Sequence, residues 1–257
     1  MVKQLLIYER AVQVNQRQHG DLSVKSGADY GFAKQVNSVP LMAAEFEPAC
    51  SEYAIVFAGQ DKQITPVVLL GVRDQENLYV DDKGAWHAKY IPAFVRRYPF
   101  VFSGDNDGKT FTLCVDEDFP GVNREGIGER LFDSAGERTQ YLKTVLGFLQ
   151  AYQAQFEATR AFCQRLVEFN LLEAMRADFT LPSGQRISLA GFMSVNRDRL
   201  RALPGETLAR FAAVGELDLI YAHLHSQRNF AATAERILGV MPVAPGSNSG
   251  GAEGAAA

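Results

Sequence analysis

Residues 138–176 read RTQYLKTVLGFLQAYQAQFEATRAFCQRLVEFNLLEAMR, and this stretch separates two kinds of sequence in the chain. Its apolar side chains recur every three or four residues, as at Leu142, Leu146 and Leu149, and Gly147 is its only glycine. That spacing places them on one face of a helix. The pattern predicts a long helix, or two abutting helices, from about 138 to 176, with the apolar stripe against the core.

The sequence before this stretch, residues 1–130, is predicted to be mainly β-structure. Short runs rich in β-branched and aromatic residues alternate with turn formers, and the turn-forming segment 104–108 is typical of a hairpin connection. The predicted strands are Leu5–Tyr8, Leu22–Val24, Tyr53–Phe57, Val67–Val72, Leu78–Val80, Val95–Phe102 and Thr110–Val115. Met42–Glu47 is predicted to form a short helical turn, and Ser134 and Glu137 have the spacing of a helix capping box.

The sequence after residue 176 mixes short elements. Short helices are predicted at Asn196–Leu203, Glu206–Val214 and Asn229–Leu238, and a short strand at Ile187–Phe192. Leu217–His225 fits either a buried strand or a helix. Residues 241–257 lack the apolar side chains needed to fold and predict a disordered tail. The expected fold is α+β: a β-rich part, residues 1–130, packed with a mainly helical part, residues 131–240, of the same compact unit.

Composition limits the possible functions. Hydrophobic residues make up 47% and charged residues 22% of the 257, with a net charge of -4. This acidic balance argues against nucleic-acid binding, which normally needs a basic surface. Cys50, Cys114 and Cys163 are far apart, which excludes a zinc ribbon or a thioredoxin-like motif and favours reduced thiols. Met1–Arg10 lacks a signal-peptide pattern and no segment is long and apolar enough to span a membrane, so we expect a cytoplasmic protein.

The sharpest catalytic candidate is a possible iron site. No nucleophile-elbow or phosphate-loop motif occurs in the sequence. His19 and Asp21 have the His-x-Asp spacing of two ligands in the facial triad of non-haem iron enzymes, and His223 or His225 would supply the third. Arg228 would then bind a 2-oxo acid, with Fe(II) as the metal cofactor. The alternatives are an ordinary polar turn at His19 and packing roles for the C-terminal histidines, whose rings would share a face on a strand but point apart on a helix.

Residues 86–102 combine one Trp, two Tyr, three Phe, two Pro and an arginine pair. If the segment is extended, Arg96 and Arg97 point to opposite faces. One of them would then be internal, against aromatic rings or a carboxylate, or the segment would line a cleft for an anionic or planar ligand. The candidate ligand-binding residues are Trp86, Tyr90, Arg96, Arg97 and Tyr98.

The segment Tyr90–Phe100 resembles the Tyr-Ile-Pro-Ala-Phe-(aliphatic)-Arg-Arg-Tyr-Pro-Phe signature of SapC-like bacterial proteins, named from a surface-layer gene cluster. Pro66–Gly71 and Tyr221–Leu224 fit the same family, and Tyr53–Phe57 fits it except at Ala54, where a proline is more usual. The resemblance covers roughly residues 5–238.

This resemblance brings no catalytic residues and no cofactor. It implies a non-catalytic binding or accessory protein of surface-layer or TonB-dependent nutrient uptake systems, whose partner is a small molecule, a peptide or a protein. The rival hypothesis is an Fe(II)/2-oxo acid-dependent oxygenase that uses His19, Asp21 and a C-terminal histidine, and a third is a structural assembly subunit.

Overall fold

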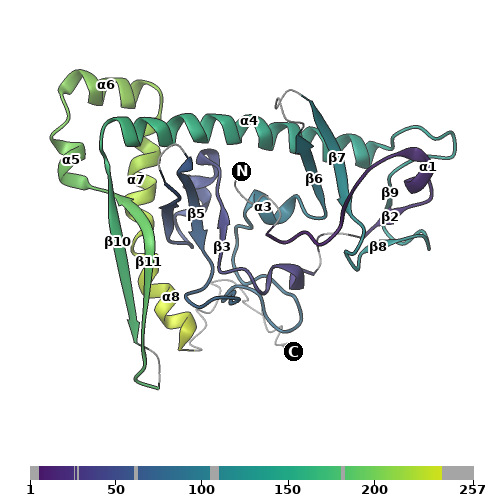
Figure 1. Ribbon diagram of the computed structural model, residues 1–257, viewed down its shortest axis with the longest axis horizontal. Helices are drawn as coiled ribbons and strands as arrows, with labels where there is room; N and C mark the ends of the chain where they lie inside the picture. Colours follow the sequence, from purple (N-terminus) through teal and green to yellow (C-terminus); the bar gives the residue numbers. More distant parts are fainter. Residues whose placement is uncertain are drawn as a thin grey trace, which may run out of the picture.

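The computed structural model describes residues 6–25, 27, 29–60, 63–104, 110–180 and 183–238, and the structural statements below concern these residues. Strands lie mainly in the N-terminal half of the chain and helices mainly in the C-terminal part (Figure 1). The α+β fold class is therefore confirmed. The predicted tail, 241–257, lies outside the described residues, and the division of the chain at residue 130 stays a prediction.

Helix α4 (Gln140–Glu168) crosses the molecule along the top of the view in Figure 1. It begins at Thr139, whose hydroxyl accepts a hydrogen bond from the Leu142 N–H (3.3 Å), and not at the predicted capping box. It ends where Asn170 adopts a left-handed backbone conformation with φ 51°. The predicted helix was right up to this point and wrong from there to residue 176.

The residues that follow α4 form a strand because they pair with a later segment. The resulting five-stranded antiparallel sheet has the order β10 (Leu172–Thr180), β11 (Arg186–Val195), β4 (Ile55–Ala58), β5 (Thr65–Leu69), β3 (Ser38–Pro40). Strand pairing overrides the helix preference of residues 173–176. β11 is longer than the strand predicted for it, and β4 is fully buried at Ile55, Val56 and Phe57.

A second, three-stranded sheet contains β1 (Ala11–Gln13), β7 (Phe111–Asp116) and β6 (Phe100–Gly104), with β7 in the centre. The two-residue strands β8 (Val122–Asn123), β2 (Ser23–Val24) and β9 (Glu129–Arg130) form a third sheet. Two strand predictions were wrong, and a third, Val95–Phe102, was right only for residues 100–102, which belong to β6. Residues 6–8 form no strand, Leu78–Val80 contributes a single bridge from Val80 to Trp86, and Val95 belongs to a helical turn.

Short helices complete the described part of the chain. They are α1 (Gln16–His19), η1 (Gly31–Ala33), η2 (Ala43–Glu45), α2 (Phe46–Ala49), α3 (Ala93–Arg96), α5 (Arg197–Arg201), α6 (Gly205–Ala213), α7 (Glu216–Ser226) and α8 (Asn229–Ile237). The predicted turn at Met42–Glu47 is confirmed, and α7 decides the open choice at Leu217–His225 in favour of a helix. Within the described ranges no helix has the length and apolar character needed to cross a membrane.

Candidate functional site

The aromatic signature segment is fixed from within by a buried carboxylate. Glu45 is 6% exposed, and its carboxylate accepts hydrogen bonds from the backbone N–H groups of Met42 (2.9 Å) and Ala93 (2.7 Å). The Tyr90 hydroxyl donates a third hydrogen bond to it (2.6 Å). Because the Ala93 N–H opens helix α3, Glu45 satisfies a helix N-terminus from a distant part of the chain.

The two signature arginines have different surroundings. Arg97 is 5% exposed, and its guanidinium carbon lies 4.3 Å from the ring centre of Phe94 and 4.8 Å from that of Tyr152. Arg96 is exposed, and its guanidinium carbon lies 5.8 Å from the ring centre of Tyr90. One arginine is thus internal, as expected. The two side chains diverge because residues 93–96 form a helical turn, whereas the sequence predicted an extended strand there.

Tyr98 belongs to the interior. Its ring stacks on Phe32 with 4.1 Å between centres, and its hydroxyl donates to Asp116 (3.2 Å). The fully buried Asp116 also accepts from the backbone N–H groups of Glu9 (2.8 Å) and Arg10 (3.0 Å). This carboxylate therefore joins the N-terminal segment to the signature, and burial, followed by Asp116, raises the pKa of Tyr98.

Trp86 completes the predicted ligand set and is half-buried. Its indole N–H donates to the Tyr53 hydroxyl (2.9 Å), which in turn donates to the Tyr90 carbonyl oxygen (2.5 Å). All five candidate ligand-binding residues therefore use their side chains in contacts with the protein itself. Arg96, the exposed one, donates from Nε to the Ile91 carbonyl oxygen (2.9 Å). Their role in ligand binding stays a prediction.

His223 projects from helix α7 and places its ring between strands β4 and β11, where these two strands separate. β11 pairs with β4 only at Phe192 and Met193, and continuing this register would place Val195 opposite Ile55. The imidazole bridges these two residues, with Nε2 3.0 Å from the Val195 nitrogen and Nδ1 3.0 Å from the Ile55 oxygen. The contacts define a neutral ring that accepts at Nε2 and donates at Nδ1. Burial lowers its pKa to about 4.

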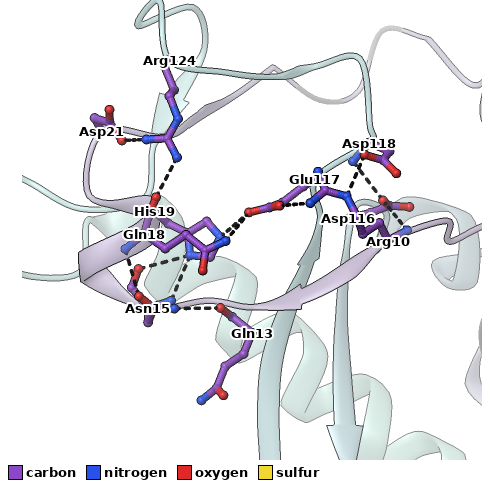
Figure 2. Close-up of polar contacts among 10 residues, drawn as sticks. All are labelled: Arg10, Gln13, Asn15, Gln18, His19, Asp21, Asp116, Glu117, Asp118 and Arg124. Carbon is purple, nitrogen blue, oxygen red and sulfur yellow. Dashed lines mark hydrogen bonds and ion pairs between the residues drawn. The ribbon is translucent and has the colours of Figure 1, made fainter.

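His19 is also fully buried, at the centre of the polar cluster drawn in Figure 2. Its Nε2 lies 3.0 Å from Glu117 Oε1, and its Nδ1 lies 3.1 Å from the backbone nitrogen of Asn15. Nδ1 also lies 3.1 Å from the Asn15 carbonyl oxygen, so both ring nitrogens are in contact with the protein. Arg10 binds Glu117 from the other side (2.5 Å). Burial raises the pKa of Glu117, but hydrogen bonds from His19 and Gln18 and the charge of Arg10 outweigh it, so the pKa is lowered.

The structure does not bring the predicted iron ligands together. Asp21 is exposed and forms an ion pair with Arg124, and Figure 2 shows it turned toward Arg124 and not toward the His19 ring. His223 contacts β4 and β11, far from these partners, and His225 is exposed on α7. No group of three or more His, Cys, Asp or Glu side chains in the described parts of the chain could hold a metal ion. The residues present therefore do not fit the Fe(II) site.

A cavity of about 690 Å³ lies between the first half of α4 and strands β1 and β7, and we call it the α4 groove. It is larger than two further cavities, of about 490 and 160 Å³, and within the range of small-ligand sites. Its apolar surface includes Phe102, Phe111 and Leu146. Phe111 is 40% exposed, which is unusual for a large aromatic side chain on the central strand of a sheet.

Polar side chains surround this apolar surface. Gln13, Gln16, Arg138 and Gln150 line the groove. None of the four side chains takes part in a hydrogen bond or ion pair with a described residue. In Figure 2 the Gln13 side chain points away from the His19–Glu117 contact. The groove therefore combines an apolar surface with polar groups that can bind a ligand.

The signature segment and the other matching segments indicate one family, and comparison with protein-family models decides which family it is. The SapC family profile matches residues 14–232. The chain belongs to the SapC family. No curated protein and no solved structure matches it.

The α4 groove of this SapC family protein was missed in the sequence because its residues come from β1, β7 and α4. One signal was available. Leu142, Leu146 and Gln150 follow each other at four-residue spacing and so share one face of a helix. A polar residue at the end of an apolar line marks a place where the helix face leaves the core.

Proposed function

We propose that this SapC family protein is a non-catalytic binding protein that holds a small ligand in the α4 groove. The observation that carries the proposal is the set of four polar side chains without described partners around the apolar surface of the groove. Binding sites combine such a surface with a few polar groups that orient the ligand. A partner that is a larger molecule would have to enter the groove by one of its side chains.

The surroundings of the acids and imidazoles support a non-catalytic role. Glu45 and Asp116 each accept several hydrogen bonds from the backbone, and His223 uses both ring nitrogens between two strands. A general base needs a free acceptor within reach of a substrate and a pKa near the working pH. A neutral His223 with a pKa of about 4 meets neither condition. These groups are placed to hold the fold.

The proposal includes the setting that the family resemblance implies, an accessory role in surface-layer or TonB-dependent nutrient uptake. Family membership supports this part. A protein that binds a small nutrient or a surface-layer component fits both settings, and the groove is the part of the described structure that would contact the ligand.

An NMR screen tests the proposal. The ¹⁵N-labelled protein is titrated with a library of amino acids, short peptides, sugars and organic acids, and backbone shifts are recorded. We expect the strongest compound to move resonances of residues 138–150, 13–16 and 111–113 together, because these segments line the groove. Shifts confined to other parts of the molecule, or no shifts with any compound, would contradict it.

A further inference from the structure

The charge of the α4 groove selects among ligands. Arg138 is the charged side chain among the described lining residues, and none of those residues carries a carboxylate. Its guanidinium forms no ion pair with a described residue, whereas Arg10, Arg124 and Arg165 each bind a carboxylate of the protein. A guanidinium offers two parallel N–H donors that match a carboxylate. The groove therefore favours a ligand with a carboxylate over a cation.

The amide side chains in the groove limit the class of ligand further. Gln13, Gln16 and Gln150 line the groove, and each carries two N–H donors and one acceptor oxygen. Several amides around one cavity match a ligand that has many hydroxyl groups, since each hydroxyl both donates and accepts. A simple fatty acid or aromatic acid would leave these amides without partners, which costs binding free energy when they lose water.

The apolar surface suits a ring with one non-polar face. Phe111 and Phe102 lie with 5.7 Å between ring centres, and Phe111 is 40% exposed toward the cavity side of the sheet. The C–H groups of a pyranose ring form such a face, while its hydroxyls lie around the edge. An aromatic ring below and amides beside the sugar would then contact both kinds of surface.

We propose that the α4 groove binds a saccharide that carries a carboxylate, such as a uronic acid unit. This inference rests on the proposed binding function and names its ligand class. Arg138 binds the carboxylate, the three glutamines bind the hydroxyls, and Phe111 packs against the ring.

Calorimetric titration with trigalacturonate and with its fully methyl-esterified form tests the inference, since the ester keeps the shape and removes the charge. We expect the acid to bind at least about tenfold more tightly than the ester, because one charge-assisted pair is worth that much or more. Arg138→Gln should remove the difference, and Arg138→Lys should retain part of it. Arg197→Gln, on exposed α5 far from the groove, is the matched control and should bind as the wild type. Raising the salt concentration to 0.5 M should weaken the binding of the acid more than the binding of the ester.

The possible failures separate the two claims. Equal binding of acid and ester, unchanged in Arg138→Gln, overturns the acidic ligand and leaves a binding groove. If neither saccharide binds while another library compound shifts the groove resonances, the saccharide ligand class is wrong and the proposed binding function remains. No shift of the groove resonances with any compound overturns both.

Discussion

The buried imidazole of His223 makes the stability of this protein depend on pH in a way that can be calculated. The folded state keeps the ring neutral, because Nε2 accepts from the Val195 N–H, and burial lowers its pKa from 6.5 to about 4. In the unfolded chain the ring is protonated below about 6.5. Between these two values the unfolded state binds a proton that the folded state does not. Stability is therefore complete above pH 6.5 and falls as the pH is lowered toward 4.

The size of the loss follows from the pKa difference. Each pKa unit corresponds to about 1.4 kcal/mol, so the full loss is about 3.5 kcal/mol, of which about 3 kcal/mol has occurred at pH 4. By pH 5, about 2 kcal/mol of it is already lost. The ring is fully buried, so solvent screening does not reduce this value. A change of this size is a large part of the stability of a typical domain.

Urea denaturation at several pH values between 7.5 and 5.0 measures the effect. The wild type should lose about 2 kcal/mol more over this range than His223→Ala, which has no ring to protonate. His225→Ala is the matched control, because His225 is exposed on the same helix, and it should follow the wild type. If His223→Ala does not fold, NMR titration of the wild-type ring should show it neutral down to pH 5. Equal losses in wild type and His223→Ala, or a folded-state ring that titrates near 6.5, would refute the reasoning.

Two further substitutions test the internal contacts. Glu45→Ala removes the acceptor of two backbone N–H groups and of the Tyr90 hydroxyl, and should lower the free energy of unfolding by about 3 kcal/mol or more, whereas the exposed neighbour Glu47→Ala should change it by less than about 0.5 kcal/mol in the same urea experiment. Gly147→Ala should raise the free energy of unfolding by about 0.5–1 kcal/mol, because the added methyl group meets no atom within 4 Å and alanine favours the helix. A lower free energy of unfolding in this variant would contradict the exposed position of Gly147.

Local pattern was enough to predict the elements that follow simple periodicity. The apolar stripe of α4 repeats at helical spacing, and β4 and β7 are short runs of β-branched and aromatic residues. The end of the helix was not predicted, because the apolar pattern continues to residue 176, whereas the chain leaves the helix where Asn170 adopts a left-handed conformation. Strand β10 could not be predicted in this way, since Glu173–Arg176 favours a helix and becomes a strand only by pairing with β11.

The parts that failed depend on contacts between distant residues. The turn at Ala93 is fixed by Glu45, and nothing in the segment 90–100 indicates that acceptor. The role of His223 requires the separation of β4 from β11, which is a property of the sheet and not of the helix that carries the ring. Ligand spacing of His19 and Asp21 was equally misleading, because side-chain directions decide whether neighbours share a site.

The most direct test of the account is to fill the α4 groove. Leu146→Trp places a bulkier side chain, an indole ring, in the cavity. Gly147→Ala, at the next position of the same helix, leaves the cavity open. The library compound that binds most tightly in the NMR screen is titrated into both variants and the wild type by calorimetry. The account predicts binding at least about tenfold weaker in Leu146→Trp, as expected when a ligand loses its site, and unchanged in Gly147→Ala. Wild-type affinity in a folded Leu146→Trp protein would contradict the claim that the α4 groove is the binding site.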